Sequence, residues 1–194
     1  MVIVGVTGGI GSGKSVVCGI IRTMGFSVFN ADAEAKFVIE TDDAVITSLK
    51  RIFGEDVYIN GKYNRTKVSE IVFSNKELLA KLNSVVHSAL KRRFIEWLNM
   101  NSSSKVVFFE AAILFESGAN MWVDKVVVVT APEELRIQRV TKRDGLTPGE
   151  VKLRINNQLH QGVLVAKSDY TIDNSEGKLI VPQVNTIISE LQSI

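Results

Sequence analysis

Residues 2–15 have the sequence VIVGVTGGIGSGKS, and this stretch decides the fold. Its first part, Val2 to Val6, is short, rich in β-branched residues and bounded by glycines, which predicts a strand buried on both faces. Its second part, Gly8 to Ser15, matches the pattern G-x-x-x-x-G-K-[ST] in full. Apolar residues then recur at helical spacing until Gly25, so we expect a helix to follow the motif directly.

This glycine-rich motif predicts a loop that holds the phosphates of a nucleotide. The glycines allow the backbone to wrap a phosphate with its N–H groups, and the positive end of the following helix favours the same anion. We expect Lys14 to reach the β- and γ-phosphates and the Ser15 hydroxyl to ligate Mg²⁺. The alternative is a chance glycine-rich turn, but a strand before the motif and a helix after it are the context that phosphate binding requires. The expected ATP-binding residues of the loop are Gly9, Ile10, Gly11, Ser12, Gly13, Lys14, Ser15 and Val16.

Short apolar runs predict the rest of the sheet. They lie at Phe26–Phe29, Val106–Phe109 and Val126–Val129, with a weaker one at Tyr170–Ile172. Helical patterns separate most of these runs, which predicts an α/β fold with a parallel sheet and right-handed crossovers.

The stretch from about residue 34 to residue 104 departs from this alternation. Its amphipathic, charged patterns favour a largely helical insertion between two strands of a single domain, and not a separate domain. The residues from Ser74 to Glu77 have the form of a helix capping box. Further helices are expected near Pro132 and at Thr147-Pro148, where proline suits the first helical position.

The composition excludes several classes of protein. Hydrophobic residues make up 45% and charged residues 23%, and the net charge of +2 is too small to indicate nucleic acid or a membrane surface as partner. No segment approaches the roughly 20 apolar residues of a membrane helix. Cys18 is the only cysteine, so an internal disulfide is impossible and a reducing compartment fits. The first residues carry no targeting pattern, and we expect a cytoplasmic location.

Three carboxylates are candidates for chemistry. Asp32 lies just past the second predicted strand, at the edge where α/β sheets bind ligands, and can accept a proton from an attacking hydroxyl. An N-cap of the next helix is an equally good interpretation of Asp32. Glu110 ends the most apolar strand and resembles the Walker B carboxylate, which holds Mg²⁺ or its waters. Glu116, taken alone, is better explained as a solvated loop acid.

Basic residues offer a second set of candidates. Arg136, Arg139 and Arg143 share one helix face. Most basic helix faces are simply solvated, but arginines on a closing lid can hold phosphates and offset charge on a transferring group. Arg65 and His87 can hold an anionic acceptor, although a histidine in such a place more often packs than reacts.

Together these residues resemble the dephospho-coenzyme A kinase family, whose members phosphorylate the ribose 3′-hydroxyl of dephospho-coenzyme A. The resemblance begins at residues 7–15 and runs along nearly the whole chain. Asn30-Ala31-Asp32 is similar to a D-A-D segment of the family, which implies that Asp32 is the catalytic base. Arg154 and Gln158 match an R-I-x-x-Q segment, and residues 168–174 resemble an A-D-x-V-I-D-N ending, which implies that Asn174 lies beside the adenine.

The resemblance implies a P-loop kinase core with a parallel sheet of about five strands. The core would comprise residues 1–33, 105–138 and 166–194, with an acceptor-binding insertion at 34–104. A lid at 139–165 would exclude water when it closes. The implied substrates are ATP, with Mg²⁺, and dephospho-coenzyme A. The implied catalytic residues are Lys14, Asp32, Arg139 and Arg143. Arg139 and Asn174 are also implied to bind ATP. Ser15 is implied to ligate Mg²⁺, and Glu110 is a candidate to hold the ion through a water molecule. The implied acceptor-binding residues are Asp32, Arg65, His87, Glu110, Leu114, Glu116 and Arg154.

The chain departs from the family pattern at Asn30, Ser88, Ala112 and Leu164, and Glu110 stands where many members have aspartate. These departures leave details of acceptor binding open. A nucleoside or nucleotide kinase remains an alternative, since it needs the same loop, an anion-binding insertion and an arginine lid. A GTP-dependent switch protein is a remote one, because its N-K-x-D motif is missing here.

Overall fold

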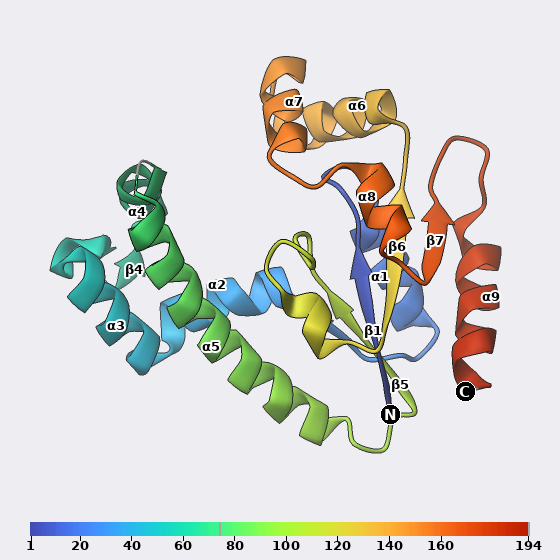
Figure 1. Cartoon of the computed structure of the whole chain (residues 1–194), viewed down its shortest axis with the longest axis horizontal. Coiled ribbons are helices and arrows are strands. Elements are labelled where there is room, and N and C mark those ends of the chain that lie inside the picture. The colour runs from blue at the N-terminus through green and yellow to red at the C-terminus, as the bar shows by residue number, and fades with distance from the viewer. Residues whose placement is uncertain (74, 194) are drawn as a thin grey trace. The chain divides into compact units, whose positions relative to one another are not determined.

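A computed structural model of the chain describes residues 1–73 and 75–193 (Figure 1). The chain divides into two compact units. The first consists of Met1–Asn30 and Asn101–Ile194, and the second is the intervening segment Ala31–Met100.

The first unit is built on a parallel sheet of five strands in the order β2-β5-β1-β6-β7 (Figure 1). The predicted parallel α/β sheet is therefore confirmed. The nucleotide motif leaves β1 at the centre of this sheet, and the carboxyl ends of the parallel strands share one edge, where α/β proteins bind ligands. The strands are β1 (Val2–Thr7), β2 (Val28–Asn30), β5 (Val106–Glu110), β6 (Lys125–Thr130) and β7 (Tyr170–Asp173).

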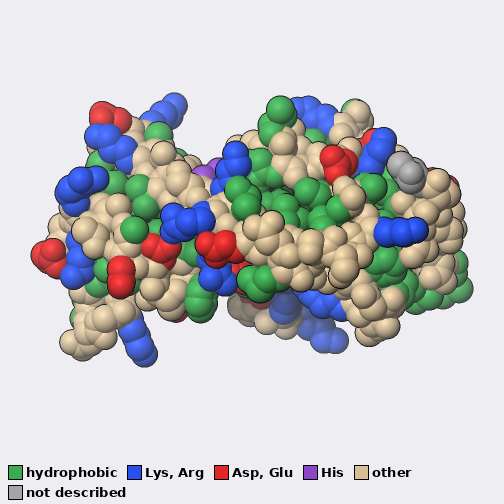
Figure 2. All heavy atoms as spheres, turned by 90° about the horizontal axis from the view of Figure 1, so that it is seen from below, with side chains coloured by type: hydrophobic (Ala, Val, Ile, Leu, Met, Phe, Trp, Pro, Cys, Tyr) green, Lys and Arg blue, Asp and Glu red, His purple; other side chains and the backbone are tan. Residues whose placement is uncertain are grey.

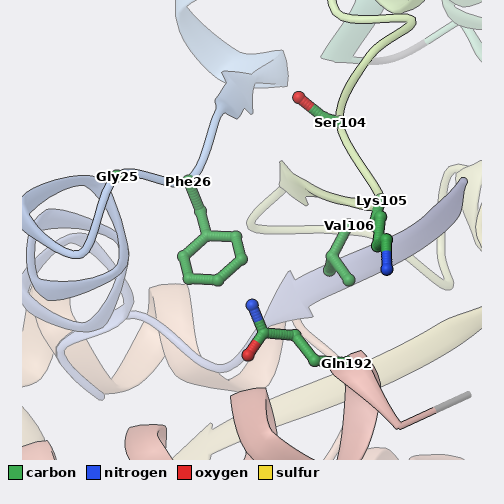
Figure 3. A pocket seen from close by; sticks show the side chains of 6 residues that line it. All are labelled: Gly25, Phe26, Ser104, Lys105, Val106 and Gln192. Carbon is green, nitrogen blue, oxygen red and sulfur yellow. The ribbon is translucent and has the colours of Figure 1, made fainter.

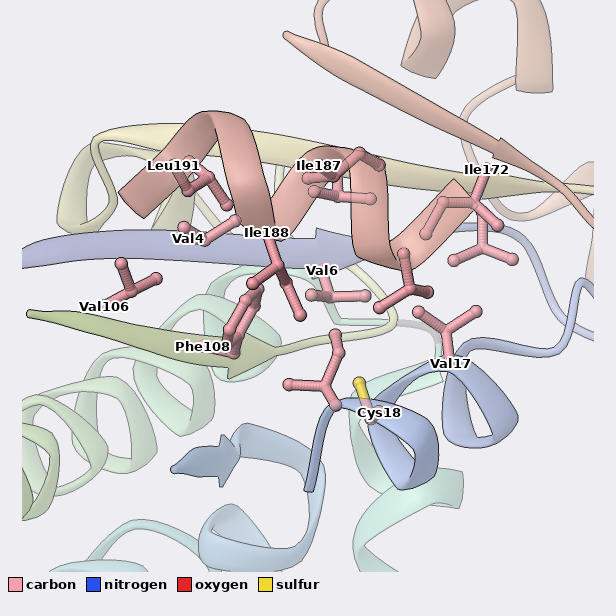
Figure 4. Close-up of a cluster of buried hydrophobic side chains, with 14 residues drawn as sticks. Val4, Val6, Val17, Cys18, Val106, Phe108, Ile172, Ile187, Ile188 and Leu191 are labelled. Atoms are coloured by element: carbon pink, nitrogen blue, oxygen red, sulfur yellow. The ribbon is translucent and has the colours of Figure 1, made fainter. Parts of the chain in front are cut away.

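The central strands are apolar along most of their length because both faces of the sheet are covered. On one face, α1 (Lys14–Thr23) and α9 (Ile180–Gln192) contribute to a buried cluster that includes Val6 and Phe108 (Figure 4). On the other face, Phe109 stacks on Phe29 and meets Trp122 edge-on. Strands buried on both faces lack the alternation of polar and apolar residues that is typical of a strand with one face in solvent.

Three helices lie between β6 and β7: α6 (Glu133–Asp144), α7 (Pro148–Asn156) and α8 (Gln161–Ala166). The predicted helix start at Thr147-Pro148 is confirmed. The Thr147 side chain accepts the N–H of Glu150, and the Glu150 carboxylate accepts the N–H of Thr147 in return, which forms a capping box.

The second unit is helical, with a small cluster of Val38, Val45, Leu49 and Ala89 at its core. It also contains a two-stranded hairpin that we did not predict, turned by Asn60 and Gly61 at φ values of 50° and 76°. Asn-Gly is the commonest pair for such a turn, so the signal was present in the sequence. The elements are α2 (Ala31–Thr41), α3 (Asp43–Phe53), η1 (Glu55–Val57), β3 (Tyr58–Ile59), β4 (Lys62–Tyr63), α4 (Arg65–Phe73) and α5 (Lys76–Met100).

The start of α5 is capped by Asn75, whose side chain accepts the N–H of Leu78 at 3.0 Å. Ser74, the cap expected from the sequence, lies outside the described residues. Within the part of the chain that the structure describes, no helix has both the length and the apolar character needed to cross a membrane.

Candidate active site

The glycine-rich motif forms a loop between β1 and α1. Gly11 and Gly13 have φ values of 79° and 97°, in the left-handed region that favours glycine. A Cβ on Gly11 would lie 2.5 Å from the backbone oxygen of Arg136, and one on Gly13 would lie 2.1 Å from Nδ2 of Asn174. The glycines of the motif therefore serve both the backbone turn and the close approach of neighbouring segments.

Side chains hold the carbonyl oxygens of this loop. Nε of Arg136 donates to Ile10 at 2.9 Å, Nη1 of Arg139 donates to Gly11 at 3.5 Å, and Nδ2 of Asn174 donates to Ser12 at 2.7 Å. The C=O and N–H of one trans peptide unit point in opposite directions. The N–H groups that follow Ile10 and Ser12 in the same peptide units therefore point away from these donors, as a loop that binds an anion requires.

Two of the predicted residues from distant segments meet at the loop. Nη2 of Arg139 donates to the backbone oxygen of Asn174 at 3.0 Å, and the N–H of Asn174 donates to Thr130 at 2.8 Å. Lys14 is the first residue of α1, directly after the loop, with Nζ 3.2 Å from the oxygen of Gly8. The structure thus brings Lys14, Arg139 and Asn174 together at the carboxyl edge of the sheet.

Arg136 and Gln158 also contact the loop, although the catalytic and binding residues implied by the family resemblance did not include them. Arg136 is only 5% exposed, and burial lowers the pKa of its guanidinium, an effect that the nearby Glu133 opposes. Oε1 of Gln158 accepts the N–H of Ile10 at 2.8 Å. The sequence carried signals for both, since Arg136 shares a helix face with Arg139 and Gln158 ends the R-I-x-x-Q segment.

The other two predicted arginines of this region do not contact the loop in this structure. Arg143 is exposed and makes a bidentate ion pair with Asp144, at 2.7 Å and 2.9 Å. This hydrogen-bonded pair raises the pKa of Arg143 and lowers that of Asp144. Arg154 is exposed on α7, where its charge helps to lower the pKa values of Asp144 and Glu150.

Two predicted acceptor residues follow β5. Leu114 is fully buried, and a Cβ on Gly5 would lie 2.8 Å from its Cδ2, so it packs tightly under β1. Glu116 is exposed, and its Oε1 accepts the N–H of Leu159 at 3.0 Å. In this structure Leu114 thus serves packing, and Glu116 tethers the segment that follows α7.

The remaining predicted residues belong to the second unit. Asp32 is exposed and is the second residue of α2. Because the helix begins at Ala31, its bounds do not favour the N-cap interpretation, although a carboxylate in the first turn still suits the helix dipole. Arg65 is the exposed first residue of α4, and His87 lies half-buried in α5.

A cavity of about 260 Å³ lies elsewhere in the first unit, lined by Phe26, Lys105, Val106 and Gln192 among others (Figure 3). It borders the start of β5, at the opposite end of that strand from Glu110, and so is separate from the phosphate loop. On the face that Figure 2 shows, basic and acidic side chains are interspersed.

Comparison with known proteins identifies the family. A family model described as dephospho-CoA kinase matches residues 2–179. The chain belongs to the dephospho-CoA kinase family. A dephospho-CoA kinase from Porphyromonas gingivalis is 36% identical over 194 residues, which cover 100% of this chain and 96% of that protein. The resemblance inferred from the sequence is thereby confirmed.

Solved structures agree with the family and with the fold. The crystal structure of TT1252 from Thermus thermophilus matches with a TM-score of 0.88 and 31% identity, over 98% of this chain and 97% of that one. A dephospho-CoA kinase from Campylobacter jejuni matches with a TM-score of 0.71 and 26% identity, again over 98% and 97%. The predicted P-loop kinase fold is confirmed.

One departure from the family pattern has a direct structural partner. Asn30 stands where the dephospho-CoA kinase pattern has aspartate, and its Nδ2 donates to Oε2 of Glu110 at 3.0 Å. Glu110 is only 4% exposed and also lies 3.6 Å from Nη2 of Arg22. An amide at position 30 can donate to the buried carboxylate, whereas a second carboxylate would repel it.

The same carboxylate lies beside a buried thiol. Cys18 is buried, and burial together with the charge of Glu110 raises the pKa of its thiol well above the ordinary range. The side chains of Cys18 and Glu110 are also hydrogen-bonded. We therefore regard Cys18 as a packing residue and not as a nucleophile.

Proposed function

We propose that this chain transfers the γ-phosphate of ATP to the ribose 3′-hydroxyl of dephospho-CoA, giving CoA and ADP. The observation that carries the proposal is the family match over residues 2–179, which includes the phosphate loop, the segment 31–100 and the helices after β6. The location proposed for this reaction is the cytoplasm, whose reducing conditions suit a chain with one cysteine.

The loop would hold the phosphates of ATP. Lys14 directly follows the last glycine of the motif, and its ammonium group would bind the β- and γ-phosphates. Asn174 would lie beside the adenine, which its contact with Ser12 supports because it ties the end of β7 to the same loop. Arg139, held between Gly11 and Asn174, would offset the charge that develops during transfer.

The donor set fits magnesium. Mg²⁺ prefers oxygen ligands and is commonly held by one or two protein groups together with substrate phosphates. Ser15, exposed in the first turn of α1, would be the direct ligand, and Glu110 would act through water. When bound, the ion would neutralise phosphate charge. Residues 1–73 and 75–193 contain no cluster of three or more His, Cys, Asp or Glu side chains that could hold a metal ion by themselves.

Asp32 would act as the general base that accepts the proton of the 3′-hydroxyl. Its exposed carboxylate in the first turn of α2 is accessible to a substrate. Arg65, His87, Glu116 and Arg154 would contribute to acceptor binding directly, and the fully buried Leu114 would support the site through packing. Arg143 would act from a lid at 139–165, and to reach a phosphate it would have to exchange its pairing with Asp144 for the more highly charged anion.

The decisive test is an assay of ADP release with Mg-ATP and separate acceptors: dephospho-CoA, adenosine, AMP, CMP and none. We expect strong turnover with dephospho-CoA alone and only slow hydrolysis without acceptor. Turnover with a nucleoside or nucleotide in its place would overturn the acceptor assignment while leaving the ATP site intact.

A further inference from the structure

Two side chains outside the predicted active-site set hold Ile10 of the phosphate loop from opposite ends. Nε of Arg136 donates to its carbonyl oxygen at 2.9 Å, and Oε1 of Gln158 accepts its N–H at 2.8 Å. The N–H and the C=O of one residue belong to successive peptide units. Together, the two contacts therefore fix both peptide planes that flank Ile10.

Arg136 has the loop, and not a carboxylate, as its partner. It is 5% exposed, and among the described residues no acidic side chain forms an ion pair with it. A Cβ on Gly9 would lie 2.2 Å from its Nη2, so the guanidinium rests directly on the loop backbone. A buried cation that makes no ion pair is unfavourable, and a bound anion offsets that cost. The loop binds such an anion when a nucleotide phosphate enters.

Gln158 approaches Ile10 from a segment that is itself anchored. The next residue, Leu159, donates its N–H to Glu116 at 3.0 Å. Further along, Oε1 of Gln161 accepts the N–H of Ala131, at the end of β6, at 3.2 Å. The linker between α7 and α8 is thus tied to the sheet beyond Gln158, so the acceptor oxygen that Gln158 presents to Ile10 has a fixed position.

We propose that Arg136 and Gln158 form a clamp on Ile10 that holds the phosphate loop in its anion-binding conformation before the nucleotide arrives. The physical reason is the composition of the loop, since glycines lose more conformational freedom on ordering than other residues. Holding Ile10 in advance lowers the ordering cost that binding would otherwise include. Both residues are positioning residues, and the inference rests on the proposed function only in taking a nucleotide as the ligand.

The test compares Arg136→Met and Gln158→Met with two control variants on the exposed face of α6. Lys142→Met removes a positive charge, and Gln138→Met removes a side-chain amide. ADP affinity is measured by calorimetry without acceptor, and KM and kcat are measured for both substrates. We expect each clamp variant to lose about tenfold in ADP affinity, the effect of one lost hydrogen bond to an ordered group. KM for ATP should rise in parallel, while KM for dephospho-CoA and both controls stay unchanged.

The double variant adds a second criterion. If both side chains act through Ile10, the second substitution should lower ADP affinity less when the first is already present. The fold-loss of affinity in the double variant should therefore be smaller than the product of the two single fold-losses. A full product would show that the two residues act independently and would overturn the clamp.

The experiment distinguishes a loss of folding from a loss of nucleotide binding. Thermal melting identifies a variant that fails to fold, and if Arg136→Met does so, Gln158→Met carries the test because it replaces a neutral, half-buried side chain. Unchanged ADP affinity in folded Gln158→Met overturns the proposal. Since ADP binding needs no acceptor, a wild-type chain that binds ADP but leaves dephospho-CoA unphosphorylated would contradict the proposed function alone.

Discussion

At the scale of single residues, Asp32 is the group on which the proposed chemistry depends most. An amide cannot accept the proton of the attacking hydroxyl, so Asp32→Asn should lower kcat by about a hundredfold or more while leaving ADP affinity unchanged. Asp43→Asn is the matched control, because Asp43 is an exposed acid in the first turn of the next helix, α3. Steady-state kinetics and calorimetry check both variants. An unchanged kcat in Asp32→Asn would leave Asp32 with only its favourable place in the first turn of α2.

Residues of the site differ in how well a sequence can reveal them. Lys14 and Ser15 belong to one continuous motif, so spacing alone predicts them. Arg136 and Gln158 contact Ile10 across 126 and 148 positions of the chain. The helix face shared with Arg139 and the R-I-x-x-Q segment single out these two residues, but no local pattern shows that they contact the loop. Their role follows only from the tertiary contacts of α6 and of the linker after α7.

At the scale of elements, replacing a glycine by alanine should have opposite effects in α1 and in the loop before it. Gly19 lies inside α1, and a Cβ added there would meet no neighbouring segment within 4 Å, so Gly19→Ala should raise the free energy of unfolding by about 1 kcal/mol. Gly11→Ala should instead abolish ADP binding, because its Cβ would meet the backbone of Arg136 and its φ is 79°. Urea denaturation and calorimetry check the pair. A lower stability for Gly19→Ala would contradict this account.

The junction of β6 and β7 predicts a dependence on pH. Asp169, just before β7, accepts Nζ of Lys125 at 2.9 Å and the N–H of Val126 at 2.8 Å. Burial works against the charged form, but these two hydrogen bonds outweigh it and lower the pKa of Asp169. Because its pKa is lower in the folded state, the charged carboxylate stabilises the fold at pH values above the unfolded-state pKa of about 3.9. This contribution is lost as the pH falls through the folded-state pKa.

Asp169→Asn should therefore reduce stability at pH 7, by less than about 1 kcal/mol because the pair is partly exposed. The difference from the wild type should shrink as pH falls below about 4. Urea denaturation at pH 7 and at pH 3 measures it. An equal difference at both pH values would mean that the charge of Asp169 is not what ties β7 to β6.

Elements of the sheet were predicted more accurately than those of the second unit, for a physical reason. Strands buried on both faces leave continuous apolar runs, and β5 and β6 depart from their predicted ranges by single residues. The expected second strand, Phe26–Phe29, is instead Val28–Asn30, since Phe26 packs edge-on against Phe108 before the strand begins. The hairpin β3–β4 has only two residues in each strand, too few for periodicity to register.

At the scale of the whole molecule, the sequence predicts the succession of strands and helices but not which strands pair with one another. Alternating strands and helices indicate a parallel sheet, but the order β2-β5-β1-β6-β7 depends on which strands meet across long stretches of chain. β2 pairs with β5 although the entire second unit, Ala31–Met100, lies between them in sequence. The amphipathic, charged pattern of residues 34–104 predicted a helical segment inserted between two strands, but it did not show which strands pair across the insertion.

Nucleotide binding should also be visible in the stability of the whole chain. A ligand that binds only the folded state adds about 2.7 kcal/mol at 100 times its dissociation constant, so Mg-ADP should raise the melting temperature in a concentration-dependent way. Lys14→Ala should lose most of that rise, because it removes the cation that faces the phosphates, while Lys142→Ala, an exposed lysine of α6, should keep it. Chelating the magnesium should reduce the rise in the wild type, since the ion and the phosphates bind together. Thermal scans across ADP concentrations measure all three effects. An equal rise in Lys14→Ala and wild type would mean that the nucleotide stabilises the fold from a site other than this loop.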